Sequence, residues 1–130
     1  MKRWNGWGRT DYIYHFTESS KAFVEKMIGR GQIIPDASLQ TTLKKVPKSR
    51  LPENILYSTD KEVRLRHARG QSLPDWIALR YGKINKFPDA VATPNNKEDI
   101  RKLINMAKKG HFSIIPYGGG TSVVGHINVE

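Results

Sequence analysis

A run of glycines followed by two hydroxyl residues, near the carboxyl end of the chain, is the segment best suited to chemistry. Gly118, Gly119 and Gly120 are followed directly by Thr121 and Ser122. Successive glycines allow backbone conformations closed to other residues, so consecutive N–H groups can point into one concavity and approach a phosphate closely. The two hydroxyl groups add further donors. The sequence therefore predicts an anion site, most naturally for a phosphate group.

The elements before this loop are predicted to place it at the end of a strand. A short apolar run at residues 90–92 is followed by an amphipathic pattern at 96–109 and a second apolar run at 112–116. Strand, helix and strand with tight connections form a right-handed β-α-β unit with parallel strands. Nucleotide ligands bind at the carboxyl ends of strands in open α/β sheets.

Two common phosphate-binding motifs do not fit the loop. No Lys follows the glycines as a Walker A loop requires, and Val123 and Val124 stand where a G-x-G-x-x-G motif would open a helix. A kinase and a Rossmann dehydrogenase are thereby disfavoured. A flexible turn is the simpler alternative, for which two glycines would be enough. The hydroxyl pair and Gly125 favour binding.

The first part of the chain is expected to be helical or irregular. A short strand is predicted at residues 12–16, and an amphipathic helix with a serine cap, Ser19 or Ser20, runs from there to Gly29. The stretch 33–56 carries three prolines, so no long elements are expected there apart from a turn of helix around 38–45.

Two further short helices are predicted to meet at a glycine. Thr59 would cap the first, residues 60–69, which Gly70 closes; the second begins after Ser72 and ends at Gly82. The first helix is strongly basic, with Lys61, Arg64, Arg66, His67 and Arg69. We expect it to be solvated or to face another domain.

The loop and its surroundings resemble FAD-linked oxidases of the vanillyl-alcohol oxidase / p-cresol methylhydroxylase (PCMH) superfamily. Residues 116–125, PYGGGTSVVG, are similar to the loop that binds the FAD diphosphate in that superfamily, and residues 87–94 are similar to the segment before it. Residues 4–8, WNGWG, look like the signature near the start of alkyldihydroxyacetone-phosphate synthases, the flavin-dependent ether-lipid branch. Residues 69–82 are similar to the helix that precedes the FAD domain of those synthases.

The resemblance implies an α+β chain in two parts. Residues 1–86 would form a mostly helical or irregular N-terminal cap segment, and residues 87–130 the first β-α-β unit of a PCMH-type FAD-binding domain. That domain would be incomplete, because the rest of the FAD domain and the substrate domain follow this loop in the family. We therefore expect a fragment of a longer enzyme, from a truncated reading frame, a designed piece or proteolysis.

The resemblance also implies the cofactor and its contacts. Thr121 stands where covalent members place the His that attaches to the flavin, and His126 lies too late to replace it, so FAD is expected to be noncovalent. Tyr117 stands where many relatives have Arg, which costs little because backbone donors do most of the binding. The implied cofactor-binding residues are Pro116, Tyr117, Gly118, Gly119, Gly120, Thr121, Ser122 and Gly125.

The implied activity is that of the parent enzyme. It would either oxidise a hydroxy acid or alcohol, or exchange the acyl group of an acylated dihydroxyacetone phosphate for a fatty alcohol, as alkylglycerone-phosphate synthases do. Its partners would be the remaining domains and a small-molecule or lipid substrate. No catalytic residue and no metal site is expected before Glu130, because the carboxylates are scattered and the four histidines lack metal-site spacing. The fragment alone is expected to be inactive.

Charge supports an alternative function of another class. The chain has 22 Lys plus Arg against 12 Asp plus Glu, a formal charge of +10, which attracts polyanions. A small basic module that binds nucleic acid or anionic lipid is the alternative, although the basic helix lacks the interleaved aromatics that single-strand binding uses. The chain has no Cys, no signal-peptide pattern and no long apolar run. These features predict a cytoplasmic protein, with peripheral membrane attachment left open.

Overall fold

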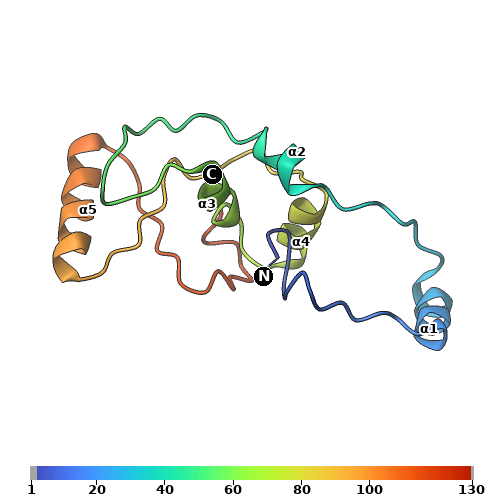
Figure 1. The fold of residues 1–130 in the computed structure, drawn as a ribbon. Helices are drawn as coiled ribbons and strands as arrows, with labels where there is room; N and C mark the ends of the chain where they lie inside the picture. The colour runs from blue at the N-terminus through green and yellow to red at the C-terminus, as the bar shows by residue number, and fades with distance from the viewer. Residues whose placement is uncertain (1–2, 130) are drawn as a thin grey trace.

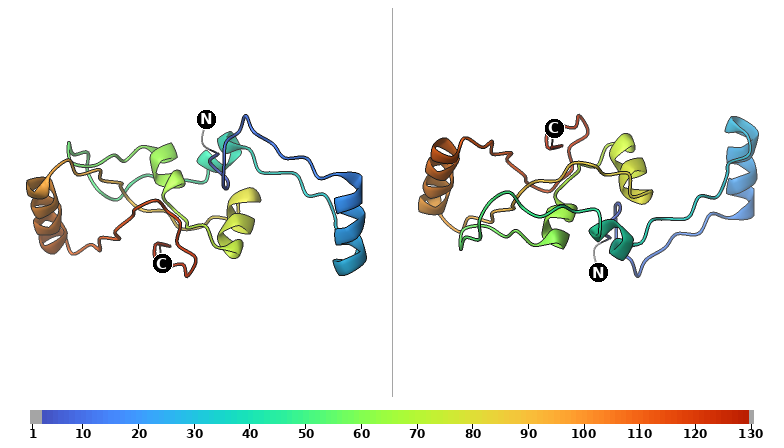
Figure 2. Two further views of the ribbon diagram at one scale, coloured as in Figure 1. Left: turned by 90° about the horizontal axis from the view of Figure 1, so that it is seen from below. Right: turned by 90° about the horizontal axis from the view of Figure 1, so that it is seen from above.

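The computed structural model describes residues 3–129, and within that range the chain forms five helices joined by long extended segments (Figure 1). The helices α2, α3 and α4 lie together in the middle, whereas α5 and α1 stand at opposite ends (Figures 1 and 2). After α5 the chain returns to the centre. The bounds are α1 Glu18–Ile28, α2 Leu39–Leu43, α3 Lys61–Arg66, α4 Leu73–Arg80 and α5 Lys97–Gly110.

Helix starts follow from local capping chemistry. The helix α4 begins after Ser72, as the sequence predicts, and Ser72 and Asp75 form a complete capping box there. Two caps differ from the prediction. Thr17, rather than Ser19 or Ser20, caps α1 by accepting from the backbone N–H of Ser20. Asp60 rather than Thr59 caps α3, because its carboxylate reaches the N–H of Val63 at 2.9 Å.

The basic helix is shorter than predicted. α3 ends at Arg66, with His67 as its C-cap, instead of continuing to Arg69. The next residues turn away, so that Gly70 and Gln71 can donate backbone hydrogen bonds to the segment that follows the glycine loop. Long-range hydrogen bonds therefore compete successfully with the last turn of the helix.

The predicted strands do not form within residues 3–129. Residues 12–16 and 112–116 are without ladder pairing, and of residues 90–92 only Val91 is paired, in one antiparallel bridge to Ser58. A strand requires a neighbouring strand for its N–H and C=O groups, and these segments find none among the described residues. Of the predicted β-α-β unit, the structure contains the helix, α5, with Asn96 as its cap.

The core is small and lies among the three central helices. Six residues are buried together, and Trp4, Leu39 and Leu43 pack against them. Arg64 is also buried; its Nε donates to the carbonyl of Pro88 at 2.7 Å and its Nη1 to that of Pro47 at 2.8 Å. Burial lowers the pKa of Arg64. The buried apolar residues of this cluster are Val46, Leu65, Ala68, Leu79, Ile84 and Phe87.

The helix α1 contributes nothing to this core. It stands away from the other helices at the end of two extended segments (Figures 1 and 2), and none of its residues is buried. Phe23 and Met27, on its predicted apolar face, are 65% and 67% exposed. Among residues 3–129 no helix combines the length and the apolar character that crossing a bilayer requires.

Candidate anion-binding cavity at the glycine loop

A cavity of about 260 Å³ lies where three segments meet. The N-terminal segment contributes Arg3, the last residue of α3 and the turn after it contribute Arg66 and Arg69, and the glycine loop contributes Gly118 and Gly119. Among the described residues that line this cavity there is no carboxylate. An enclosure with three guanidinium groups and exposed glycine backbone is complementary to an anion.

The three glycines of the loop differ in whether the fold itself requires a residue without a side chain. A Cβ at Gly118 would meet nothing within 4 Å, and a Cβ at Gly119 would meet only the Thr121 methyl at 3.7 Å. A Cβ at Gly120 would collide with the hydroxyl of Tyr117, and Gly120 has φ +71°. The fold therefore needs glycine at 120, whereas at 118 and 119 it leaves open space beside the backbone.

Backbone donors of the loop have no acceptor within the part of the chain that the structure describes. Among residues 3–129, the N–H groups from Gly118 to Ser122 donate to no acceptor. Backbone N–H groups in folded proteins normally have partners, from protein, water or ligand. Consecutive free donors beside a cationic cavity are the arrangement that phosphate-binding loops use.

Tyr117 fixes the loop against the end of α3. Its ring lies 4.6 Å from that of His67, centroid to centroid, and its hydroxyl donates to the carbonyl of Arg66 at 3.4 Å. Burial raises the pKa of Tyr117, so the phenol stays neutral at ordinary pH. The contact places the residue before the glycines as a wall of the cavity rather than as a charged ligand.

The other residues implied by the resemblance shape the loop rather than the cavity wall. Ser122 is buried; its Oγ accepts from the N–H of Gly125 and lies 3.1 Å from Nδ1 of His126. Gly125 has φ +76°, a conformation that favours glycine. Pro116 and Thr121 are exposed and lie outside the lining of the cavity. Gly118, Gly119 and Tyr117 are thus the predicted residues that the structure brings to the cavity.

A buried carboxylate joins the end of the loop to the start of α4. Asp75 accepts from the Ser72 hydroxyl at 2.6 Å and from Nδ2 of Asn128 at 2.9 Å, and its Oδ1 lies 3.7 Å from Nη1 of Arg69. The N–H of Gln71 donates to the carbonyl of Ser122 at 3.0 Å. The sequence places Asp75 in the first turn of a helix, but it contains no signal for the partnership of Asp75 with Asn128, 53 positions away.

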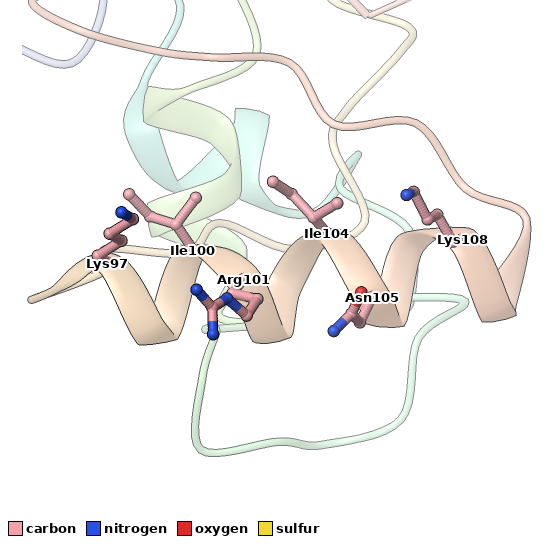
Figure 3. Close-up of a pocket in the computed structure, with 6 residues that line it drawn as sticks. All are labelled: Lys97, Ile100, Arg101, Ile104, Asn105 and Lys108. Atoms are coloured by element: carbon pink, nitrogen blue, oxygen red, sulfur yellow. The ribbon is translucent and has the colours of Figure 1, made fainter.

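A second hollow, of about 360 Å³, lies along α5 (Figure 3). Figure 3 shows Ile100 and Ile104 side by side between Lys97 and Lys108. All of its lining residues come from this one helix. It has no opposite wall and brings no groups together from different elements, so the glycine-loop cavity is the stronger candidate.

Comparisons with known proteins find relatives that align with most of the chain. No family model matches the chain. An alkyldihydroxyacetonephosphate synthase of Caenorhabditis elegans is 31% identical over 93% of this chain and 25% of its own length. A mitochondrial D-lactate dehydrogenase (cytochrome) of Arabidopsis thaliana is 29% identical over 85% of this chain and 19% of its own length. The chain thus spans a quarter or less of the length of these relatives.

Solved structures show the same relationship. A structure of alkyldihydroxyacetonephosphate synthase aligns with 98% of this chain and 29% of its own, with a TM-score of 0.65 and 25% identity. The resemblance to the FAD-linked oxidase superfamily is therefore confirmed, with alkyldihydroxyacetonephosphate synthases among the similar proteins. The fold match extends over the central helices and over α1 and α5, because it covers almost the whole chain.

Proposed function

We propose that this chain is the N-terminal part of an FAD-dependent enzyme and that its glycine loop holds the FAD diphosphate without a covalent bond. One observation carries the proposal. The free N–H groups of Gly118 to Ser122 belong to a loop that lines an arginine-rich cavity. The open space beside Gly118 and Gly119 fits a phosphate group that must approach the backbone closely.

Each part of the loop has a separate task in this proposal. Gly118 and Gly119 present bare backbone to the phosphates, and Gly120 lets the chain turn beneath the Tyr117 ring. The Ser122 hydroxyl keeps the following turn closed through Gly125. When bound, FAD supplies the redox chemistry, and these residues hold and orient it.

The parent activity is proposed from the relatives. Similarity to alkyldihydroxyacetonephosphate synthases favours an ether-lipid synthase-like reaction, and similarity to a D-lactate dehydrogenase supports oxidation of a hydroxy acid as the second candidate. In both, residues 87–130 would begin the PCMH-type FAD-binding domain. Residues 1–86 would do more than cap it, because Arg3, Arg66 and Arg69 line the cavity that the glycine loop closes.

Substitution of Gly119 by Val tests the proposal directly. The added Cβ would meet only the Thr121 methyl, at an ordinary contact distance of 3.7 Å, so Gly119→Val is expected to fold normally. It would occupy the place of the phosphate, so FAD binding is expected to be lost. The measurements are the flavin absorbance of the purified full-length protein and the midpoint of its urea unfolding.

Gly31→Val is the matched control. Gly31 also has nothing within 4 Å of an added Cβ, and it lies outside the cavity, so this variant is expected to keep its flavin. A folded Gly119→Val protein with a full complement of FAD would show that the loop does not hold the diphosphate.

A further inference from the structure

We propose that Arg3, in the tryptophan- and glycine-rich N-terminal segment, binds the phosphate oxygens of the ligand in the glycine-loop cavity. The inference rests on the proposed function and deepens it. It makes the phosphate site bipartite, with backbone N–H groups on one wall and a guanidinium group from the opposite end of the chain on the other.

Arg3 is singled out among the three arginines by its partners. Arg66 forms an ion pair with Glu62 at 2.6 Å, and Arg69 lies 3.7 Å from the buried carboxylate of Asp75. Arg3 makes a single side-chain hydrogen bond within the described part of the chain, from Nε to the carbonyl of Arg9 at 3.1 Å. Both terminal nitrogens of Arg3 therefore remain available to an anion.

The N-terminal segment is shaped so that Arg3 faces the cavity. Its N–H donates to the carbonyl of Gly8 at 3.0 Å, which closes residues 3–8 into a loop. Gly6 and Gly8 have φ +152° and +88°, values that side-chain-bearing residues rarely adopt. Trp4 packs against the hydrophobic core and anchors this loop beside α4. The WNGWG segment thus positions Arg3 at the cavity.

The chemistry of the group identifies the ligand it fits. A guanidinium presents its donors in a planar fork that matches two oxygens of a phosphate, whereas a lysine offers only a point charge. The single bond from Nε to a carbonyl fixes the orientation of the fork and leaves its outer edge open. A diphosphate, with oxygens on two linked phosphorus atoms, can contact Arg3 and the loop backbone at once.

The experiment measures FAD and riboflavin binding by flavin fluorescence in the full-length apoprotein. Arg3→Gln is expected to weaken FAD binding about tenfold, the usual effect of losing a hydrogen bond to a charged group at a partly exposed site. Riboflavin has no phosphate, so its affinity should not change. Arg3→Lys keeps the charge without the fork and should give an intermediate loss.

Arg9→Gln is the matched control. Arg9 lies in the same segment and loses the same charge, but its side chain pairs with Asp11 and does not line the cavity. Its FAD affinity should stay within about twofold of the parent's, a charge beyond the cavity being largely screened.

Two results would overturn the inference. One is an unchanged FAD affinity in Arg3→Gln, and the other is an equal loss of riboflavin binding, which would mean that the substitution disturbs the fold. If Gly119→Val loses FAD while Arg3→Gln keeps it, only the inference fails. If Gly119→Val remains folded and keeps FAD, the proposed diphosphate site fails independently of Arg3.

Discussion

Gly70 is the position where a single methyl group is expected to separate the glycine loop from the helices. A Cβ at Gly70 would lie 2.8 Å from the carbonyl oxygen of Ser122 and 3.2 Å from Oδ2 of Asp75. The first contact is with backbone and cannot be relieved by a rotamer change. Relief requires the turn that includes Ser122 to move away from the start of α4.

That movement would break two hydrogen bonds. The N–H of Gln71 donates to the carbonyl of Ser122 at 3.0 Å, and the N–H of Gly70 donates to Oδ1 of Asn128 at 3.1 Å. Two such bonds at about 1 kcal/mol each, together with about 1–3 kcal/mol for overpacking, predict that Gly70→Ala loses about 3–5 kcal/mol of unfolding free energy. The displaced loop should also bind FAD more weakly.

The assay is urea unfolding followed by tryptophan fluorescence, with Gly31→Ala as the control. Gly31 has no heavy atom within 4 Å of an added Cβ and does not have a positive φ, so Gly31→Ala is expected to be neutral or slightly stabilising. Equal stability of the two variants would refute the reasoning, since it would mean that the Gly70–Ser122 contact is not tight in solution.

Two further predictions concern the core and its ionic contacts. The Arg50 guanidinium beside Asp89 holds the pKa of that carboxyl below its usual value. The ionised Asp89 therefore stabilises the folded state above about pH 4, and this stabilisation is lost as the pH falls through the lowered pKa. Asp89→Asn should therefore have an unfolding free energy about 1–2 kcal/mol lower than the parent protein at about pH 7, and this difference should shrink toward about pH 3. A difference that does not depend on pH would contradict this assignment. Leu65→Ala, at a fully buried site, should lose about 2–5 kcal/mol. Phe23→Ser on the exposed face of α1 should change stability by less than about 0.5 kcal/mol, and equal urea midpoints for these two variants would disprove the described core.

Helix positions are largely determined by the sequence itself. Ser72 with Asp75 predicts the start of α4, and Asn96 with the apolar spacing after it predicts α5. Capping acts between residues two or three apart, so it can be recognised without knowledge of the fold. The same locality explains the errors at the caps of α1 and α3. In each case the sequence has more than one residue able to cap within a few positions, and the local backbone conformation decides which one does.

The absence of paired strands in the described chain and the assembly of the cavity were decided by the tertiary structure. Residues 112–116 have a strand-like sequence, but a strand needs a partner, and the described chain provides none. The sequence identified the glycine loop, but it could not show that Gly120 serves the fold while Gly119 faces open space. Nor could it bring Arg3 across from the other end of the chain, because that approach depends on Trp4 packing against the core. Helix caps form between residues that are close in the sequence, so the sequence alone reveals them. A binding cavity depends on which distant segments of the chain pack together, so it requires the tertiary structure.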